Sequence, residues 1–115
     1  MYSLFAHIPG IKVVVPSNPY DAKGLLLSCL DGEDPVIFME PKRVYRAARG
    51  EVPEDWFTVP VGQAHVTREG NDVTVVTYGA MVHTAMEAAE KAEEEAEGSP
   101  EKAKQSYWQP ESLPM

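Results

Sequence analysis

The sequence predicts an α/β fold with a partial parallel sheet, because two short apolar runs flank a segment with helical periodicity. The runs Lys12–Val15 and Val36–Met39 are continuous and rich in β-branched or aromatic residues, as is typical of strands covered on both faces. The segment between them repeats apolar residues at the spacing of a helix. Strand, helix and strand within about thirty residues predict a right-handed βαβ crossover with parallel strands.

The predicted helix has clear start and stop signals. Ser17 or Asn18 can cap its first N–H groups, and Pro19 suits the first helical position. Gly32 can take the positive φ that often ends a helix. Apolar residues recur at i, i+3, i+4, i+7 and i+8 and predict one buried face: Ala22, Leu25, Leu26, Cys29 and Leu30.

The rest of the chain divides into a linker, a second strand–helix unit and a tail. Residues 41–61 have the prolines and the basic residues of an interdomain linker. Val73–Tyr78 predicts a third strand, and residues 80–97 predict an amphipathic helix with an acidic outer face. Residues 98–115 contain three prolines and few branched apolar residues, which predicts a disordered tail.

Composition excludes several classes of function. The formal charge of −8 argues against nucleic-acid binding, which needs a basic surface. No apolar stretch is long enough to span a membrane, and no signal peptide is recognisable. Cys29 is the single cysteine, so it can form no disulfide within the chain. We therefore expect a cytoplasmic protein.

Several segments, in one order and at one set of spacings, resemble a known enzyme family. The family comprises the beta subunits of the thiamine-diphosphate-dependent 2-oxoacid dehydrogenases, of the pyruvate and branched-chain types. The similarity covers roughly residues 4–92, and its strongest segments are Phe5-Ala-His-Ile-Pro-Gly, Pro19-Tyr-Asp-Ala-Lys-Gly-Leu-Leu, Pro35-Val-Ile-Phe-Met-Glu-Pro-Lys-Arg, Val44-Tyr-Arg, Gly50-Glu-Val-Pro and Glu69-Gly-Asn-Asp-Val-Thr-Val-Val-Thr-Tyr-Gly-Ala-Met-Val-His.

The resemblance implies a division into domains. Residues 1–40 would be the end of a transketolase-type pyrimidine-binding domain, residues 41–61 the linker, and residues 62–97 the beginning of a transketolase-type C-terminal domain. The chain would then be an internal fragment of a longer subunit.

The resemblance also implies a function. Such subunits take part in the oxidative decarboxylation of a 2-oxoacid on thiamine diphosphate, with acyl transfer to lipoyl groups. The family's pyrimidine-contacting glutamate and active-site histidine would lie before the residues present here, and His7 is not that histidine. We therefore expect no catalytic residue, no thiamine diphosphate binding and no activity in this chain alone.

Its expected role is structural, with an alpha subunit, a second beta subunit and the lipoyl transacylase core as partners. The alternatives are a free-standing, non-catalytic α/β interaction or regulatory module, and a reading frame without a stable product.

One family site is implied at the end of the first helix. The related subunits hold a monovalent cation there, usually potassium, mainly through backbone carbonyls. By resemblance its ligands would be the carbonyls of Cys29, Leu30 and Gly32 and the side chain of Asp34. Carbonyls without partners gather at the C-terminal end of a helix, which favours a cation there. The alternative is an ordinary glycine helix stop with an exposed Asp34.

Overall fold

The computed structural model describes residues 2–98 and has α/β character in this part of the chain. Its elements are, in order, α1 (Ser3–Ala6), β1 (Lys12–Val14), α2 (Pro19–Leu30), β2 (Val36–Phe38) and α3 (Met81–Gly98). The tail that the sequence predicts to be disordered lies outside the described residues from residue 99 onward.

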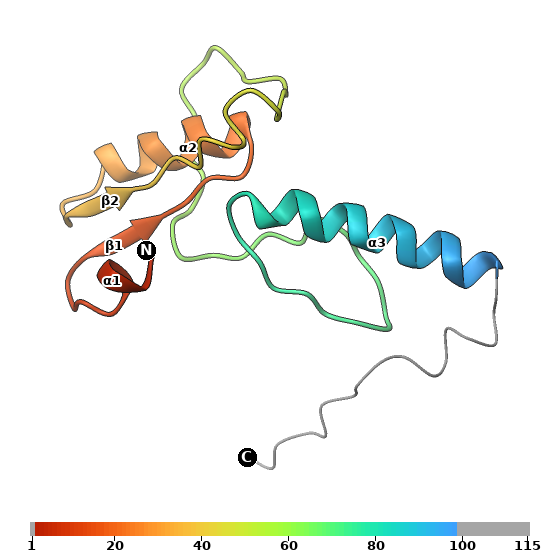
Figure 1. The fold of residues 1–115 in the computed structure, drawn as a ribbon. Coiled ribbons are helices and arrows are strands. Elements are labelled where there is room, and N and C mark those ends of the chain that lie inside the picture. Colours follow the sequence, from red (N-terminus) through yellow and green to blue (C-terminus); the bar gives the residue numbers. More distant parts are fainter. Residues whose placement is uncertain (1, 99–115) are drawn as a thin grey trace.

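The predicted βαβ crossover is confirmed. β1 and β2 pair in parallel, with Lys12 beside Val36, Val13 beside Ile37 and Val14 beside Phe38. α2 runs along the sheet as the crossover helix, and α1 lies next to β1 (Figure 1). Among residues 2–98, Val14 is buried at 5% exposure, and Pro16 is the only other buried residue with a side chain. The packed core is therefore very small.

Local signals set the limits of α2. Asn18 is the N-cap: its side chain accepts a hydrogen bond of 2.8 Å from the Asp21 N–H and donates one of 2.7 Å to the Asp21 carboxylate. Pro19 is the first residue of the helix, as predicted, and the last hydrogen bond runs from the Asp31 N–H to the Leu27 carbonyl. These contacts satisfy backbone groups that a helix end leaves free.

The predicted buried face of α2 is only partly formed. Leu26 and Leu30 are 42% and 71% exposed, so their predicted burial is wrong. The reason is the narrow sheet, because two short strands cannot cover a stripe that runs the length of a 12-residue helix. The one buried residue of α2 is Gly24, which belongs to a different face.

Gly24 is buried because part of the 41–61 segment packs against α2. The Val59 N–H donates a hydrogen bond of 3.1 Å to the Gly24 carbonyl, and the Ser28 hydroxyl donates one of 2.6 Å to the Val59 carbonyl. Tyr20 stacks on Phe57 with ring centres 4.5 Å apart. The linker is thus attached along the helix by backbone, hydroxyl and aromatic contacts.

The Lys23 side chain binds the backbone of the same segment just before Phe57. Its ammonium donates to the carbonyls of Pro53, Glu54 and Asp55, the latter two at 3.0 Å, and lies 5.2 Å from the centre of the Phe57 ring. Three carbonyl acceptors and an aromatic face together satisfy the three donors and the charge of a lysine.

The predicted third strand is not formed. Val73–Tyr78 is irregular, and Val73, Val75, Val76 and Tyr78 are 51–89% exposed. A strand needs a hydrogen-bonded neighbour, and none of the described residues pairs with this segment. Its β-branched composition alone therefore does not produce a strand.

The predicted second helix is confirmed as α3, which projects away from the sheet (Figure 1). Its first turn contacts the segment that follows β1. His83 Nε2 lies 2.7 Å from the Ser17 carbonyl, to which it donates, and Tyr2 and Tyr78 meet edge to face at 5.5 Å. Gly79, at φ +59°, approaches Val15 closely. Farther along, Arg68 and Glu93 form an ion pair of 2.5 Å.

Candidate functional site

A small cavity lies where α2 ends and the sheet begins. Its volume is about 140 Å³, and its walls are formed by Lys12, Ser28, Cys29, Gly32, Asp34, Val36 and Val61. Three of the four predicted cation ligands, Cys29, Gly32 and Asp34, thus line one space. Leu30 is not among the lining residues.

The last carbonyls of α2 have no hydrogen-bond donor among the described residues. The last helical bond runs from the Asp31 N–H to the Leu27 carbonyl at 3.1 Å. Within residues 2–98, no N–H group or side chain donates to the carbonyls of Ser28, Cys29 or Leu30. Neutral oxygens at a helix end, where the dipole is negative, form a donor set suited to a hard cation of low charge.

Gly32 lies beside the last carbonyls of α2 and has room for a side chain. A Cβ on Gly32 would lie 3.6 Å from both the Ser28 and the Cys29 carbonyl oxygens, which is ordinary van der Waals contact. Its φ is not positive, so the predicted left-handed helix stop is wrong. The helix ends instead on Asp31, whose own φ is −81°.

Asp34, the one predicted side-chain ligand, already has a cationic partner. Its carboxylate lies 2.7 Å from the Lys12 ammonium, and the two side chains are 61% and 51% exposed. The sequence analysis missed Lys12. The signal was present, because parallel pairing of the two predicted strands places Lys12 beside Val36, two residues after Asp34.

The Cys29 thiol is poorly suited to act as a nucleophile or a metal ligand. Burial raises the pKa of the Cys29 thiol, and the nearby Lys12 ammonium opposes that rise. A raised pKa keeps the sulfur protonated near neutral pH, and a protonated thiol is a poor nucleophile and a poor metal ligand. Residues 2–98 contain no group of three His, Cys, Asp or Glu side chains that could hold a metal ion.

The described residues supply no buried carboxylate that would fit the pyrimidine ring of thiamine diphosphate. None of the polar or charged side chains in residues 2–98 is buried. A carboxylate that holds a cofactor ring in a dry pocket needs such burial. The histidines lie apart: His7 Nδ1 contacts the Ser3 carbonyl at 2.7 Å, whereas His83 contacts Ser17.

Comparison with known families divides the chain into two matched segments. Residues 1–48 match the transketolase pyrimidine binding domain, and residues 62–99 match the transketolase C-terminal domain. In addition, no helix of residues 2–98 is both long and apolar enough to cross a membrane.

The curated relatives are beta subunits of oxidoreductases. The chain is 55% identical over 93 residues to the 2-oxoisovalerate dehydrogenase subunit beta of Bacillus subtilis, covering 81% of this chain and 28% of the relative. It is 56% identical over 94 residues to the acetoin:2,6-dichlorophenolindophenol oxidoreductase subunit beta of the same organism, covering 82% of this chain and 27% of the relative.

The chain is also 51% identical over 92 residues to the pyruvate dehydrogenase E1 component subunit beta of Staphylococcus aureus, covering 80% of this chain and 28% of the relative. The chain thus spans little more than a quarter of the length of these relatives. The chain is related to the beta subunits of the 2-oxoacid dehydrogenases and carries segments of both their transketolase pyrimidine-binding and transketolase C-terminal domains.

Proposed function

We propose that this chain is a structural and interface part of the beta subunit of a thiamine-diphosphate-dependent 2-oxoacid dehydrogenase. The observation that carries the proposal is the identity of 51–56% over about four fifths of the chain, which includes both matched domain segments in order. In such an enzyme thiamine diphosphate supplies the carbanion chemistry. The described residues do not fit its pyrimidine ring, so the catalytic groups would come from other parts of the assembly.

Beta subunits of these enzymes work in complexes with alpha subunits and a lipoyl core, and we propose the same class of partners here. The exposed apolar side chains agree with such a role. Leu30, Val76 and Tyr78 are 71%, 89% and 58% exposed, and large exposed apolar residues are typical of surfaces that another chain covers.

A binding experiment tests this role. Mixed with the alpha subunit of a bacterial pyruvate dehydrogenase, the chain should form a complex that light scattering detects. Titrated alone with thiamine diphosphate and magnesium, it should give no binding heat and no decarboxylation. Micromolar cofactor binding by the isolated chain would contradict the proposed role. A sharply melting monomer that ignores the alpha subunit would instead support the free-standing module.

We also propose that the cavity at the end of α2 binds a monovalent cation, potassium in the related enzymes. The ligands would be the carbonyls of Cys29, Leu30 and Gly32 and the Asp34 side chain. The carbonyls without donors support this proposal. Lys12 opposes it, because its ammonium now neutralises Asp34.

Potassium should therefore raise the free energy of unfolding relative to an equal concentration of a bulky organic cation. Mass action gives about 2.7 kcal/mol at a hundredfold excess over the dissociation constant. Lys12→Met should enlarge the difference by freeing Asp34, and Asp34→Asn should reduce it. Melting curves that coincide in the two salts for all three proteins would rule out cation binding in this cavity.

A further inference from the structure

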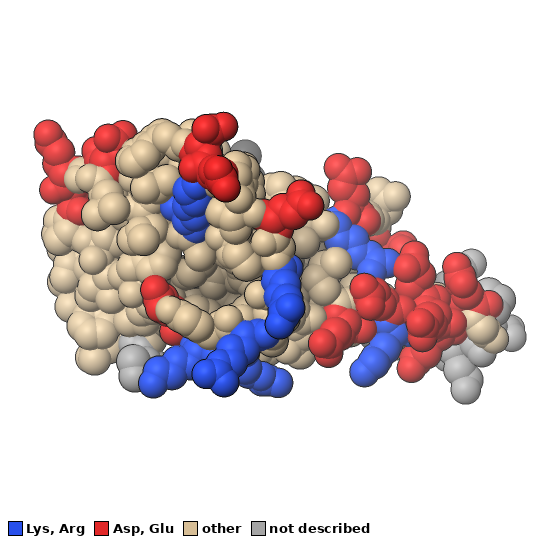
Figure 2. All heavy atoms as spheres, turned by 90° about the horizontal axis from the view of Figure 1, so that it is seen from above, with Lys and Arg blue, Asp and Glu red and all other residues tan. Residues whose placement is uncertain are grey.

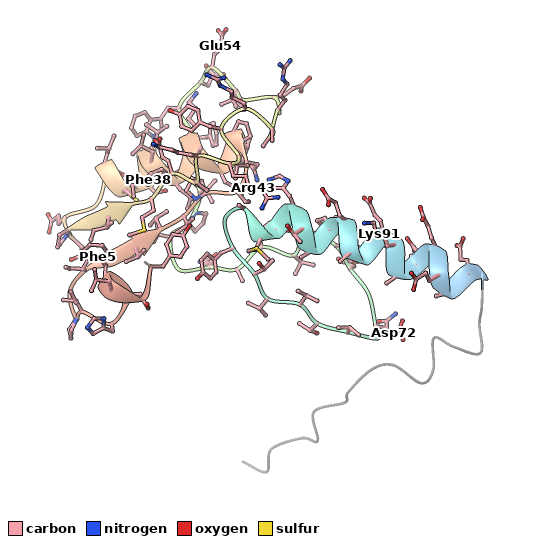
Figure 3. All side chains as sticks on the ribbon, in the orientation of Figure 1. Phe5, Phe38, Arg43, Glu54, Asp72 and Lys91 are labelled. Atoms are coloured by element: carbon pink, nitrogen blue, oxygen red, sulfur yellow. The ribbon has the colours of Figure 1, made fainter. Side chains whose placement is uncertain are left out.

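Residues 50–57 form a loop that is fixed beside the first turns of α2, although it contains no helix or strand. The Lys23 ammonium donates to three successive carbonyls of this loop, and the Phe57 ring stacks on Tyr20 at 4.5 Å. Figure 3 shows the loop above α2, with Glu54 at its tip pointing away from the rest of the chain. Backbone that is already held in place loses little further freedom when a partner binds to it.

An open hollow lies between this loop and the start of α2. Its volume is about 590 Å³, and it is lined by Tyr20, Glu51, Val52 and Pro53. The side chains of Tyr20, Val52 and Trp56 are 44%, 37% and 68% exposed. Tyrosine and tryptophan on fixed backbone are the residues that most often anchor a bound partner. The loop therefore presents apolar and aromatic surface in a form suited to binding.

Three carboxylates of the same loop have no cationic partner. Glu51, Glu54 and Asp55 are all exposed, and neither of the two ion pairs within residues 2–98 involves them. The Lys23 ammonium is bound to backbone carbonyls of the loop instead. Figure 2 looks down on this part of the molecule and shows acidic side chains there, separate from those on α3. The surface thus combines an apolar hollow with negative charge around it.

We propose that this surface binds an extended, basic segment of a partner protein, with an apolar side chain in the hollow and Lys or Arg side chains on the loop carboxylates. Charge complementarity selects this class of partner, because an acidic segment would be repelled and a wholly apolar one would bury carboxylates without counter-charges. Successive side chains of an extended segment point to opposite sides, so one segment can present both kinds of group. The inference goes beyond the proposed function, because the cation cavity lies at the other end of α2 and this surface requires neither cofactor nor alpha subunit.

A short peptide with a central leucine between lysines, and serines elsewhere, is the probe. Fluorescence anisotropy of the labelled peptide should give a dissociation constant of about 10–100 µM at low salt, as expected of a small contact. Replacing its lysines by glutamate should abolish binding, and replacing its leucine by serine should weaken binding roughly tenfold. Trp108→Phe leaves Trp56 as the single tryptophan, whose emission should shift to shorter wavelength when the peptide covers it.

Variants of the chain assign the binding to this loop. Glu51→Lys with Glu54→Lys should weaken binding of the lysine peptide at least about tenfold, because like charges then meet. Lys23→Met should also weaken it, although no carboxylate changes, because the loop is no longer held in place. Glu94→Lys with Glu97→Lys is the matched control, since it changes the net charge equally but on α3, and it should leave binding unchanged. Circular dichroism should show equal helix content in every variant.

Three results would overturn the proposal. The first is no binding of the lysine peptide at about 1 mM, the weak limit of specific recognition. The second is equal weakening by the two double variants, which would show attraction by net charge alone. The third is bound peptide with unchanged emission from Trp56, which would place the peptide elsewhere on the chain.

Discussion

Gly24→Ala is expected to lower the free energy of unfolding by about 1–3 kcal/mol, the usual cost of overpacking. Alanine is the better helix former by about 0.5–1 kcal/mol, so helix propensity alone predicts the opposite sign. The clash decides the outcome. A Cβ on Gly24 would lie 2.4 Å from Val59 Cγ2 and 2.8 Å from Phe57 Cε2.

Two further variants separate the clash from other effects. Val59→Ala in the Gly24→Ala background removes the closest atom, and the double variant should recover much of the loss. Gly70→Ala is the control, since nothing lies within 4 Å of the added carbon there. Urea titration gives the free energies, and hydrogen exchange of the Val59 amide reports directly on its bond to Gly24. If Gly24→Ala stabilises the chain and leaves that amide protected, the linker is not packed as described.

Gly79→Ala should also be strongly destabilising, and here backbone and packing act together. Gly79 has φ +59°, which costs a non-glycine residue about 1–2 kcal/mol. A Cβ there would also lie 2.9 Å from Val15 Cγ1. Relief of this contact would move the start of α3 away from β1, and the His83 contact with Ser17 would be lost.

Gly10→Ala is the matched control for the backbone term. Gly10 has φ +84° but open space around it, so its substitution carries strain without a clash. The Gly79 variant should lose more stability than the Gly10 variant, and only it should lose amide protection at Val82, whose N–H bonds to the Gly79 carbonyl. Equal losses would show that the approach to Val15 contributes nothing.

The βαβ crossover could be predicted because its signals are local. The Asn18-Pro19 start and the two β-branched runs each act within a few residues. Val73–Tyr78 was predicted wrongly for a related reason. Its composition is that of a strand, but strand formation depends on a neighbour that the sequence pattern does not supply.

Linker packing could not be predicted, because it depends on contacts between residues about thirty positions apart. Nothing in the periodicity of α2 indicates that Lys23 reaches the Pro53–Asp55 carbonyls or that Gly24 faces Val59. At the candidate site, Cys29, Gly32 and Asp34 line one cavity, whereas Leu30 does not, and the resemblance named all four as ligands. It did not indicate the Lys12 ammonium, and cation binding itself stays a prediction.

Three long-range contacts of this chain close loops of increasing length. Pairing of Lys12 with Val36 spans 24 residues, the Ser28–Val59 bond spans 31, and the His83–Ser17 contact spans 66. Because closure entropy grows as the logarithm of loop length, the longest loop costs about 0.9 kcal/mol more than the shortest. The loops overlap along the sequence: the crossover can form by itself, the linker contact needs α2 in place, and the contact of α3 closes the longest loop. Assembly therefore has a preferred direction from the N-terminal half outward, and opening has the reverse one.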